Sequence, residues 1–237
     1  MSIGFGTTAR IGHLYPSGGL CDYEVQLMAP AGVQFLTTRM PFRRTGLADD
    51  LALAEGLELH AGLLADAEVD LIAFNCTAAS MLLGPATVNA RITAATGIPS
   101  VTTIEAVLEA LAHLDARRVV LLDPYPREVE DAEVAHLAAA GHEVVARGGP
   151  ECATPVAQGS LPPEEWRRIA REVGAAGADA VLVSCAGAQV ATSIAAIEDA
   201  LGIPVVASNQ ALLWKVLHLL DLPAPGPGYG RLLNEEF

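Results

Sequence analysis

The chain has 237 residues, of which 51% are hydrophobic and 18% are charged, and its formal net charge is −14. So acidic a chain argues against nucleic acid and anionic membranes as partners, and no apolar stretch reaches the roughly 18 residues of a membrane-spanning helix. The first residues lack the basic segment and apolar core of a signal peptide, so we predict a cytoplasmic protein. The four cysteines have no C-x-x-C spacing, which argues against a metal site, and a disulfide framework is not expected at this size.

Strands and helices are expected to alternate through the first half of the chain. Apolar residues at helical spacing, namely Leu51, Leu57, Leu59, Leu63 and Leu64, predict one long helix over 47–65. The other expected helices are 22–28, 77–83, 88–95 and 103–114, and the expected strands are 10–16, 33–38, 70–74 and 100–102.

The second half repeats this plan. A Gly- and Pro-rich segment at 148–163, which contains Cys152, is expected to be a loop. Strands that alternate with helices indicate parallel sheets, and ligands bind outside the carboxyl ends of such strands. The expected strands are 119–122, 143–146, 180–183 and 205–207, and the expected helices are 128–140, 164–176, 189–201 and 209–220.

Landmarks of the first half recur in the second half at a nearly constant offset, which indicates an internal duplication. We therefore predict an α/β protein of two pseudo-symmetric lobes, each a parallel sheet flanked by helices. The first lobe is expected to comprise residues 1–104 and 208–237, and the second lobe residues 105–207. The offsets are 108 residues between Pro16 and Pro124, 109 between Cys76 and Cys185, and 105 between the Gly-Ile-Pro turns at 97–99 and 202–204.

Cys76 and Cys185 are the candidate catalytic residues. Each follows an aspartate and a short apolar strand, and each precedes small residues that can begin a helix. Backbone N–H groups at a helix N-terminus stabilise a thiolate, so this position predicts a lowered thiol pKa. The alternative is that both are packing residues, since cysteine is often buried; the duplicated placement favours the functional interpretation. Cys21 and Cys152 lack this context.

The substrate-binding candidates lie near the same strand ends. The N–H groups that follow each cysteine, with a threonine hydroxyl, can hold a carboxylate. Hydroxyls after the first strand of each half, and an amide before the first cysteine, can add hydrogen bonds. The residues after the cysteines are Thr77, Ala78 and Ala186. The hydroxyls belong to Tyr125 and Ser17, and the amide belongs to Asn75. The alternative for Asn75 is that of a strand-end residue bonded to the backbone, and the alternative for Tyr125 is a half-exposed position in a loop.

The motif Asn75-Cys76-Thr77-Ala78, with Ser184-Cys185 a lobe later, resembles the Asp/Glu racemase superfamily. Over nearly the whole chain, the sequence is most similar to the maleate isomerase and arylmalonate decarboxylase branch. The resemblance implies two lobes related by a pseudo-two-fold axis, chemistry that uses a cysteine pair without a cofactor, and a homo-oligomer.

Some features of the chain resemble the isomerases of that branch and others resemble the decarboxylases. Both cysteines are present, as in the isomerases, whereas the decarboxylases keep only the second and follow it with Gly where Ala186 stands. The isomerases have a Pro-Ser-Ser-Asn motif after the first strand, where this chain has Pro16-Ser17-Gly18-Gly19, and the C-terminal Pro-Gly-Tyr-Gly-Arg-Leu resembles the decarboxylases.

We therefore expect a cofactor-independent isomerase or racemase that acts on a small carboxylate or dicarboxylate such as maleate. An arylmalonate-type decarboxylase, with Cys185 as the proton donor, is the alternative enzyme. A non-catalytic binding protein for small acids is the alternative outside enzymes.

Overall fold

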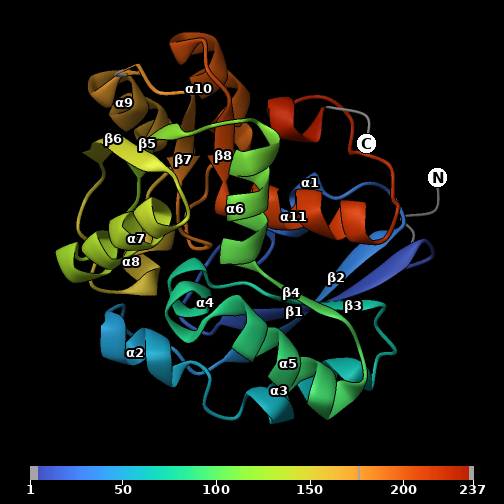
Figure 1. Ribbon diagram of the computed structural model, residues 1–237. Coiled ribbons are helices and arrows are strands. Elements are labelled where there is room, and N and C mark those ends of the chain that lie inside the picture. Colours follow the sequence, from blue (N-terminus) through green and yellow to red (C-terminus); the bar gives the residue numbers. More distant parts are fainter. Residues whose placement is uncertain (1–4, 176, 235–237) are drawn as a thin grey trace.

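The computed structural model describes residues 5–175 and 177–234. Two four-stranded parallel sheets form its two halves, with strand orders β2-β1-β3-β4 and β6-β5-β7-β8 (Figure 1). The equivalent order in both halves confirms the predicted α/β architecture of two pseudo-symmetric lobes. The strands are β1 (Ala9–Pro16), β2 (Val33–Met40), β3 (Leu71–Phe74), β4 (Ser100–Thr102), β5 (Arg118–Leu122), β6 (Glu143–Gly148), β7 (Ala180–Val183) and β8 (Val205–Ala207).

An aspartate fixes the central strand pair of each sheet. The Asp70 carboxylate accepts a hydrogen bond from the backbone N–H of Arg10 at 2.8 Å. In the second sheet, the Asp179 carboxylate accepts bonds from the N–H groups of Arg117 and Arg118 at 2.9 and 2.7 Å. The repeated aspartate thus holds β3 beside β1 and β7 beside β5, and so sets where the carboxyl ends of these strands lie.

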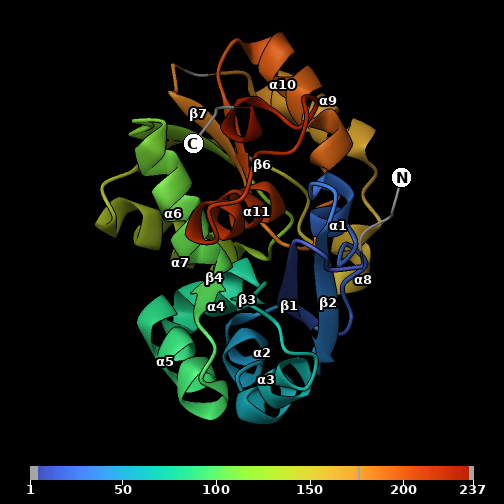
Figure 2. The ribbon, with the colours of Figure 1, turned by 90° about the vertical axis from the view of Figure 1, so that its right-hand side faces the viewer.

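Two long helices, α6 and α11, lie between the sheets, while α3 and α5 cover the outer face of the first sheet and α9 and α10 that of the second (Figures 1 and 2). One hydrophobic cluster joins both sheets to these two helices, and includes Ile11, Leu71, Val119, Ala180 and Leu212. The helices are α1 (Glu24–Met28), α2 (Leu47–Ala52), α3 (Leu57–Ala65), α4 (Thr77–Leu83), α5 (Pro85–Thr96), α6 (Thr103–His113), α7 (Arg127–Ala139), α8 (Pro155–Gly159), α9 (Pro163–Val173), α10 (Ile194–Leu201) and α11 (Ser208–Leu219), with 3-10 turns at Ala191–Ser193 and Arg231–Leu233.

The lobe boundaries predicted at residues 104 and 208 fall at the first residues of α6 and α11. Both helices pack against each other between the sheets, so neither belongs to one sheet alone. The division of the chain into two domains stays a prediction.

The long helix expected over 47–65 is two helices, α2 and α3, joined by a turn. Gly56, with φ of +69°, adopts the left-handed conformation that breaks the helix before Leu57. Only Leu57 and Leu64 of the five spaced leucines are buried, whereas Leu51, Leu59 and Leu63 are exposed. The break turns the first part of the segment, α2, toward the second lobe (Figure 1).

Three other expectations need smaller corrections. The loop expected over 148–163 contains the short helix α8, whose N-cap Thr154 accepts a hydrogen bond from the Ala157 N–H at 3.2 Å. The helix expected over 189–201 begins only at Ala191, as a 3-10 turn that leads into α10. The described part of the helix expected over 164–176 ends at Val173, and residue 176 lies outside the described residues. None of the described helices combines the length and the apolar character that a membrane crossing requires.

Candidate active site

A small cavity lies at the carboxyl ends of strands from both sheets. The space in it that is free to water-sized molecules is about 20 Å³, roughly the room for one water, so the lining side chains nearly fill it. Cys76 after β3 and Cys185 after β7 both line it, so the two cysteines share one site, as the duplication predicts. Besides them, the lining residues are the predicted Thr77, Ala78, Tyr125 and Ala186, together with Tyr15, Pro16, Gly19, Phe42, Thr45, Asp50, Pro155, Gln158 and Gly187.

Cys76 is buried and is the N-cap residue of α4. Its thiol donates a hydrogen bond to Asp50 Oδ1 at 3.8 Å. Burial, followed by the negative charge of Asp50, raises the pKa of the thiol well above its usual value. The expected lowering of this pKa is therefore wrong, because desolvation of a thiolate outweighs the N–H groups of a seven-residue helix.

Asp50, on α2, is a site residue that the sequence prediction missed. Its side chain is 1% exposed, and its Oδ2 accepts a hydrogen bond of 3.4 Å from the Gly46 N–H. Burial raises the pKa of its carboxyl to about 7. The signal in the sequence is that Asp50 precedes buried Leu53 and Leu57 by three and seven residues, which places a carboxylate on the apolar face of a helical pattern.

Cys185 lies in a loop, not directly before a helix as expected. Its φ of +118° is strained for a residue with a side chain, and such strain is concentrated at functional sites. Its sulfur accepts a hydrogen bond from the Gly187 N–H at 3.2 Å and lies 3.6 Å from Gln158 Oε1. Burial raises the pKa of this thiol to about 12, although the Gly187 N–H and the Tyr125 hydroxyl favour the thiolate. The lowered pKa expected for Cys185 is therefore also wrong.

Ser208, the first residue of α11, connects the two cysteine loops. Its hydroxyl oxygen accepts a hydrogen bond from Thr77 Oγ1 at 2.9 Å and another from the Cys185 N–H at 3.0 Å. The helix between the sheets thus fixes the residue after one cysteine relative to the backbone of the other.

Two buried carboxyl groups lie behind Tyr125 and Cys185. Asp123 accepts a hydrogen bond from the Tyr125 N–H at 2.8 Å, and Glu133 accepts one from the Ser184 hydroxyl at 2.5 Å. Burial raises the pKa of both carboxyls, and the charge of Asp123 raises that of Glu133 further. The raised pKa favours the neutral form of Glu133, which limits the negative charge beside Cys185.

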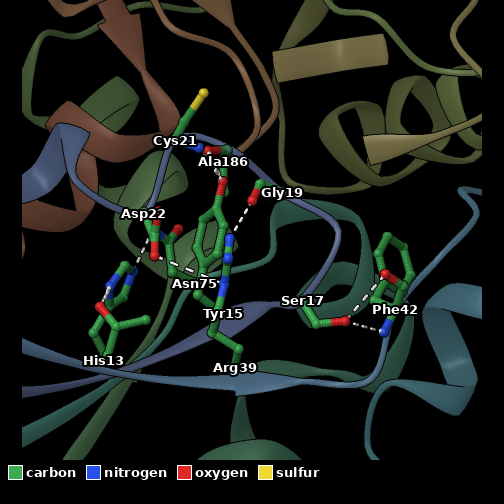
Figure 3. Close-up of polar contacts among 11 residues, drawn as sticks. His13, Tyr15, Ser17, Gly19, Cys21, Asp22, Arg39, Phe42, Asn75 and Ala186 are labelled. Carbon is green, nitrogen blue, oxygen red and sulfur yellow. Dashed lines mark hydrogen bonds and ion pairs between the residues drawn. The ribbon is translucent and has the colours of Figure 1, made fainter. Parts of the chain in front are cut away.

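Tyr15 forms one wall of the cavity and was also missed. Its hydroxyl donates to the Ala186 carbonyl and accepts from the Cys21 N–H, both at 3.1 Å (Figure 3). The Arg39 guanidinium lies 5.9 Å from its ring centroid. Gly19 packs so closely on the ring that a Cβ would lie 2.5 Å from it, so only glycine fits there. Tyr15, near the end of β1, thereby fixes the position of the loop that follows Cys185.

Ser17 and Asn75 are not among the residues that line the cavity. Ser17 instead accepts a hydrogen bond from the Phe42 N–H at 3.0 Å, and Figure 3 shows its side chain turned toward Phe42. Asn75 is fully buried, where its amide nitrogen lies 2.9 Å from both His13 Nε2 and Asn209 Oδ1 and its oxygen accepts a bond from Thr103. Ser17 thus bonds to the backbone of a distant residue and Asn75 to distant side chains, so in this structure both side chains are used within the protein framework.

Cys21 and Cys152 remain outside the cavity lining, and all four cysteines are free. Cys21 is closer to the site than expected, because its thiol donates to the Gly187 carbonyl at 3.0 Å. Over residues 5–175 and 177–234, no three His, Cys, Asp or Glu side chains are placed to hold a metal ion.

Comparison with known proteins agrees with this geometry. The family model described as arylmalonate decarboxylase matches residues 16–233. The chain belongs to this family. A maleate isomerase and an arylmalonate decarboxylase are each 31% identical to this chain. The matches confirm the branch of the Asp/Glu racemase superfamily that the cysteine motifs predict.

Three relatives illustrate the similarity. A maleate isomerase of Nocardia farcinica is 31% identical over 248 residues, which cover 96% of each chain. An arylmalonate decarboxylase of Bordetella bronchiseptica is 31% identical over 237 residues, which cover 93% of this chain and 97% of the relative. The solved structure of an N. farcinica maleate cis-trans isomerase variant, with a covalently bound succinylcysteine intermediate, has a TM-score of 0.88 at 27% identity and covers 97% of this chain and 99% of its own.

Proposed function

We propose that the chain is a cofactor-independent cis-trans isomerase of a small carboxylate, with maleate as the substrate to test first. The observation that carries the proposal is that Cys76 and Cys185 line one cavity. A proton transfer to one face of a substrate needs one thiol, whereas addition and elimination across a double bond use a nucleophile and a proton donor. The succinylcysteine intermediate of the N. farcinica relative supports thiol addition as the reaction type.

In the proposed reaction, the Cys76 sulfur adds to one alkene carbon and forms a C–S bond as its S–H proton passes to a base of the site, which returns the proton when that bond breaks. The Cys185 thiol gives its proton to the neighbouring carbon, so that the former double bond becomes a single bond and can rotate. The Cys185 thiolate then removes a proton from that carbon while the C–S bond breaks. The double bond re-forms in the trans arrangement, and both thiols return to their starting states.

The substrate carboxylates would be held by neutral donors. The described residues that line the cavity include no Lys, Arg or His. The candidate donors are the Thr77 and Ala78 N–H groups at the start of α4, the Ala186 N–H and the Tyr125 hydroxyl. In a water-poor site such fixed dipoles can stabilise one carboxylate well, and they strengthen as an enediolate develops.

Decarboxylation is the second candidate, and the apolar wall favours it. Phe42, Pro16 and Pro155 line the cavity and could receive the apolar group of a substituted malonate. The reaction would need only Cys185, which would protonate the enediolate left when carbon dioxide departs.

The test offers maleate and a phenylmalonate to the purified protein and to Cys76→Ala, Cys185→Ala and Cys152→Ala variants. Cys152 lies outside the cavity lining and serves as the matched control. Fumarate formation that either cavity substitution reduces by about 10³-fold or more, and that Cys152→Ala leaves intact, would support the isomerase.

Other outcomes would contradict it. Carbon dioxide release that survives Cys76→Ala, without fumarate formation by the parent, would assign a decarboxylase. Saturable binding of small acids without turnover of either substrate would assign a binding protein.

A further inference from the structure

The side chains that face the two cysteine sulfurs are themselves related by the duplication. Asp50 on α2 and Gln158 on α8 are 108 residues apart, which is the offset between Pro16 and Pro124. Helix α2 follows β2 and helix α8 follows β6, and these strands hold equivalent places in the two sheets. Each side chain lies on the cavity wall beside the cysteine of its own lobe.

The two sulfurs are each faced by a buried side-chain oxygen at nearly the same distance. Asp50 and Gln158 are buried at 1% and 3% exposure, and their oxygens lie 3.8 and 3.6 Å from the sulfurs of Cys76 and Cys185. The Cys185 sulfur also accepts a hydrogen bond from the Gly187 N–H at 3.2 Å. The difference is chemical, since a carboxylate can take a proton from a thiol and an amide oxygen at neutral pH can only accept a hydrogen bond.

We propose that this one difference assigns the two thiols their roles: Asp50 is the general base that removes the Cys76 proton, and Gln158 keeps Cys185 as an undissociated proton donor. The assignment deepens the proposed isomerase and rests on it for the catalytic meaning of the two roles. It also explains how a pseudo-symmetric site can run an asymmetric reaction.

Each proton that moves during the addition returns to its starting group during the elimination. As the Cys76 sulfur forms its bond to carbon, the S–H proton passes to Asp50 Oδ1, and the Cys185 thiol protonates the neighbouring carbon. On elimination, Cys185 recovers a proton from that carbon, the C–S electron pair returns to sulfur, and Asp50 gives its proton back. Cys76 never has to exist as a free thiolate, which desolvation disfavours. Cys185 is a thiolate only while the adduct lasts, and the Gly187 N–H and the Tyr125 hydroxyl favour that form.

The surroundings of each partner support its role. The charged or titratable groups that act on Asp50 are Asp49, Glu128 and the Cys76 thiol, and Asp50 in turn acts on Cys185 and Tyr125. Burial, with the charges of Asp49 and Glu128, raises the pKa of Asp50, whereas the hydrogen bonds from the Gly46 N–H and the Cys76 thiol lower it. Gln158 Nε2 donates to Thr45 Oγ1 at 2.9 Å, which directs the amide oxygen toward Cys185.

The experiment measures thiol reactivity and does not depend on the substrate. Asp50→Asn, Gln158→Glu and the double exchange D50N/Q158E keep the side-chain shape at each position. Brief iodoacetamide treatment across a pH series, with peptide mapping, gives separate rates for Cys76 and Cys185. The negative charge of Asp50 also raises the pKa of Cys76, so its removal by itself would speed alkylation through the free thiolate. If Asp50 acts as the base, Asp50→Asn should nevertheless slow Cys76 alkylation at neutral pH by about tenfold or more. Gln158→Glu should then accelerate Cys185 by a similar factor, and the exchange should make Cys185 the faster thiol.

Asp49→Asn is the matched control, because it removes a neighbouring charge on the same helix but does not face the sulfur; we expect it to change the Cys76 rate by less than about twofold. An unchanged Cys76 rate and pH dependence in Asp50→Asn, or a parent in which Cys185 reacts faster, would overturn the assignment. If circular dichroism shows that Asp50→Asn does not fold, the test is the Cys185 alkylation rate in Gln158→Glu. An increase in that rate supports the assignment, and an unchanged rate contradicts it. Asp50-dependent reactivity in a protein that does not isomerise maleate would contradict the proposed function and leave the base assignment standing.

Discussion

Asp50 and Gln158 stand at equivalent places in the two lobes, and each directs a side-chain oxygen at a cysteine sulfur, at 3.8 and 3.6 Å. The pair shows where the internal symmetry of the chain ends. The sheets, the cysteines and the aspartates that precede the cysteine-bearing strands repeat, whereas the groups that can accept a thiol proton do not. Four predictions follow from this site and its surroundings.

Removal of the second thiol should trap the first half of the reaction. In a Cys185→Ser variant, the weaker acid slows proton exchange at the carbon next to the C–S bond, so a covalent adduct on Cys76 should accumulate with maleate. Intact-protein mass spectrometry should show an increase equal to one maleic acid, and peptide mapping should place it on Cys76. An adduct on Cys21 or Cys152 would contradict the proposed nucleophile.

The activity should fall as the solution becomes acidic. Burial raises the pKa of Asp50 to about 7, so the carboxylate needed as a base is lost as pH falls through that value. In the parent, kcat/KM should fall about tenfold for each pH unit well below 7. A pH profile of Asp50→Asn should lack this acid limb and lie lower on its plateau. An identical limb in both proteins would assign the ionisation to another group.

Tyr125→Phe should lower turnover more than stability. The hydroxyl bonds to the Cys185 sulfur and favours its thiolate, and the ring remains in place after the substitution. We expect kcat to fall roughly 10- to 100-fold, with a change in KM of less than about threefold. Steady-state kinetics and the thermal midpoint, measured on the same preparation, check this. A loss confined to KM would indicate a role in ground-state binding alone.

Stability should decrease as pH rises, because of the buried carboxyls behind Cys185. Burial raises the pKa of Glu133 from 4.5 to about 8 in the folded protein, so its stabilising contribution is full below about 4.5 and is lost as pH rises through 8. Glu133→Gln keeps an oxygen for the Ser184 hydroxyl and cannot ionise. Its thermal midpoint should therefore fall less between pH 5 and pH 8, by several degrees at roughly 2–4 °C per kcal/mol. Parallel curves for parent and variant would show that Glu133 does not titrate in this range.

The sequence by itself determined the duplicated α/β plan and the cysteine pair. Alternating strands and helices demand parallel sheets, and a cysteine after the equivalent strand of each half must lie at a carboxyl end. The aspartates before β3 and β7 are local signals of the same kind, because they bond to the strand beside them. These features depend on the spacing of apolar residues and on motifs of a few neighbouring residues, both of which are visible in one sequence.

Only the tertiary structure decided which side chains complete the site and how they ionise. Asp50 was hidden in what looked like one continuous helix, and the turn that includes Gly56 frees α2 to face the cavity. Ser17 and Asn75 bond to the framework because of contacts with residues distant in the chain, such as Phe42 and Asn209. The raised pKa values of both thiols likewise come first from burial, and burial is a property of packing that no local pattern of residues contains.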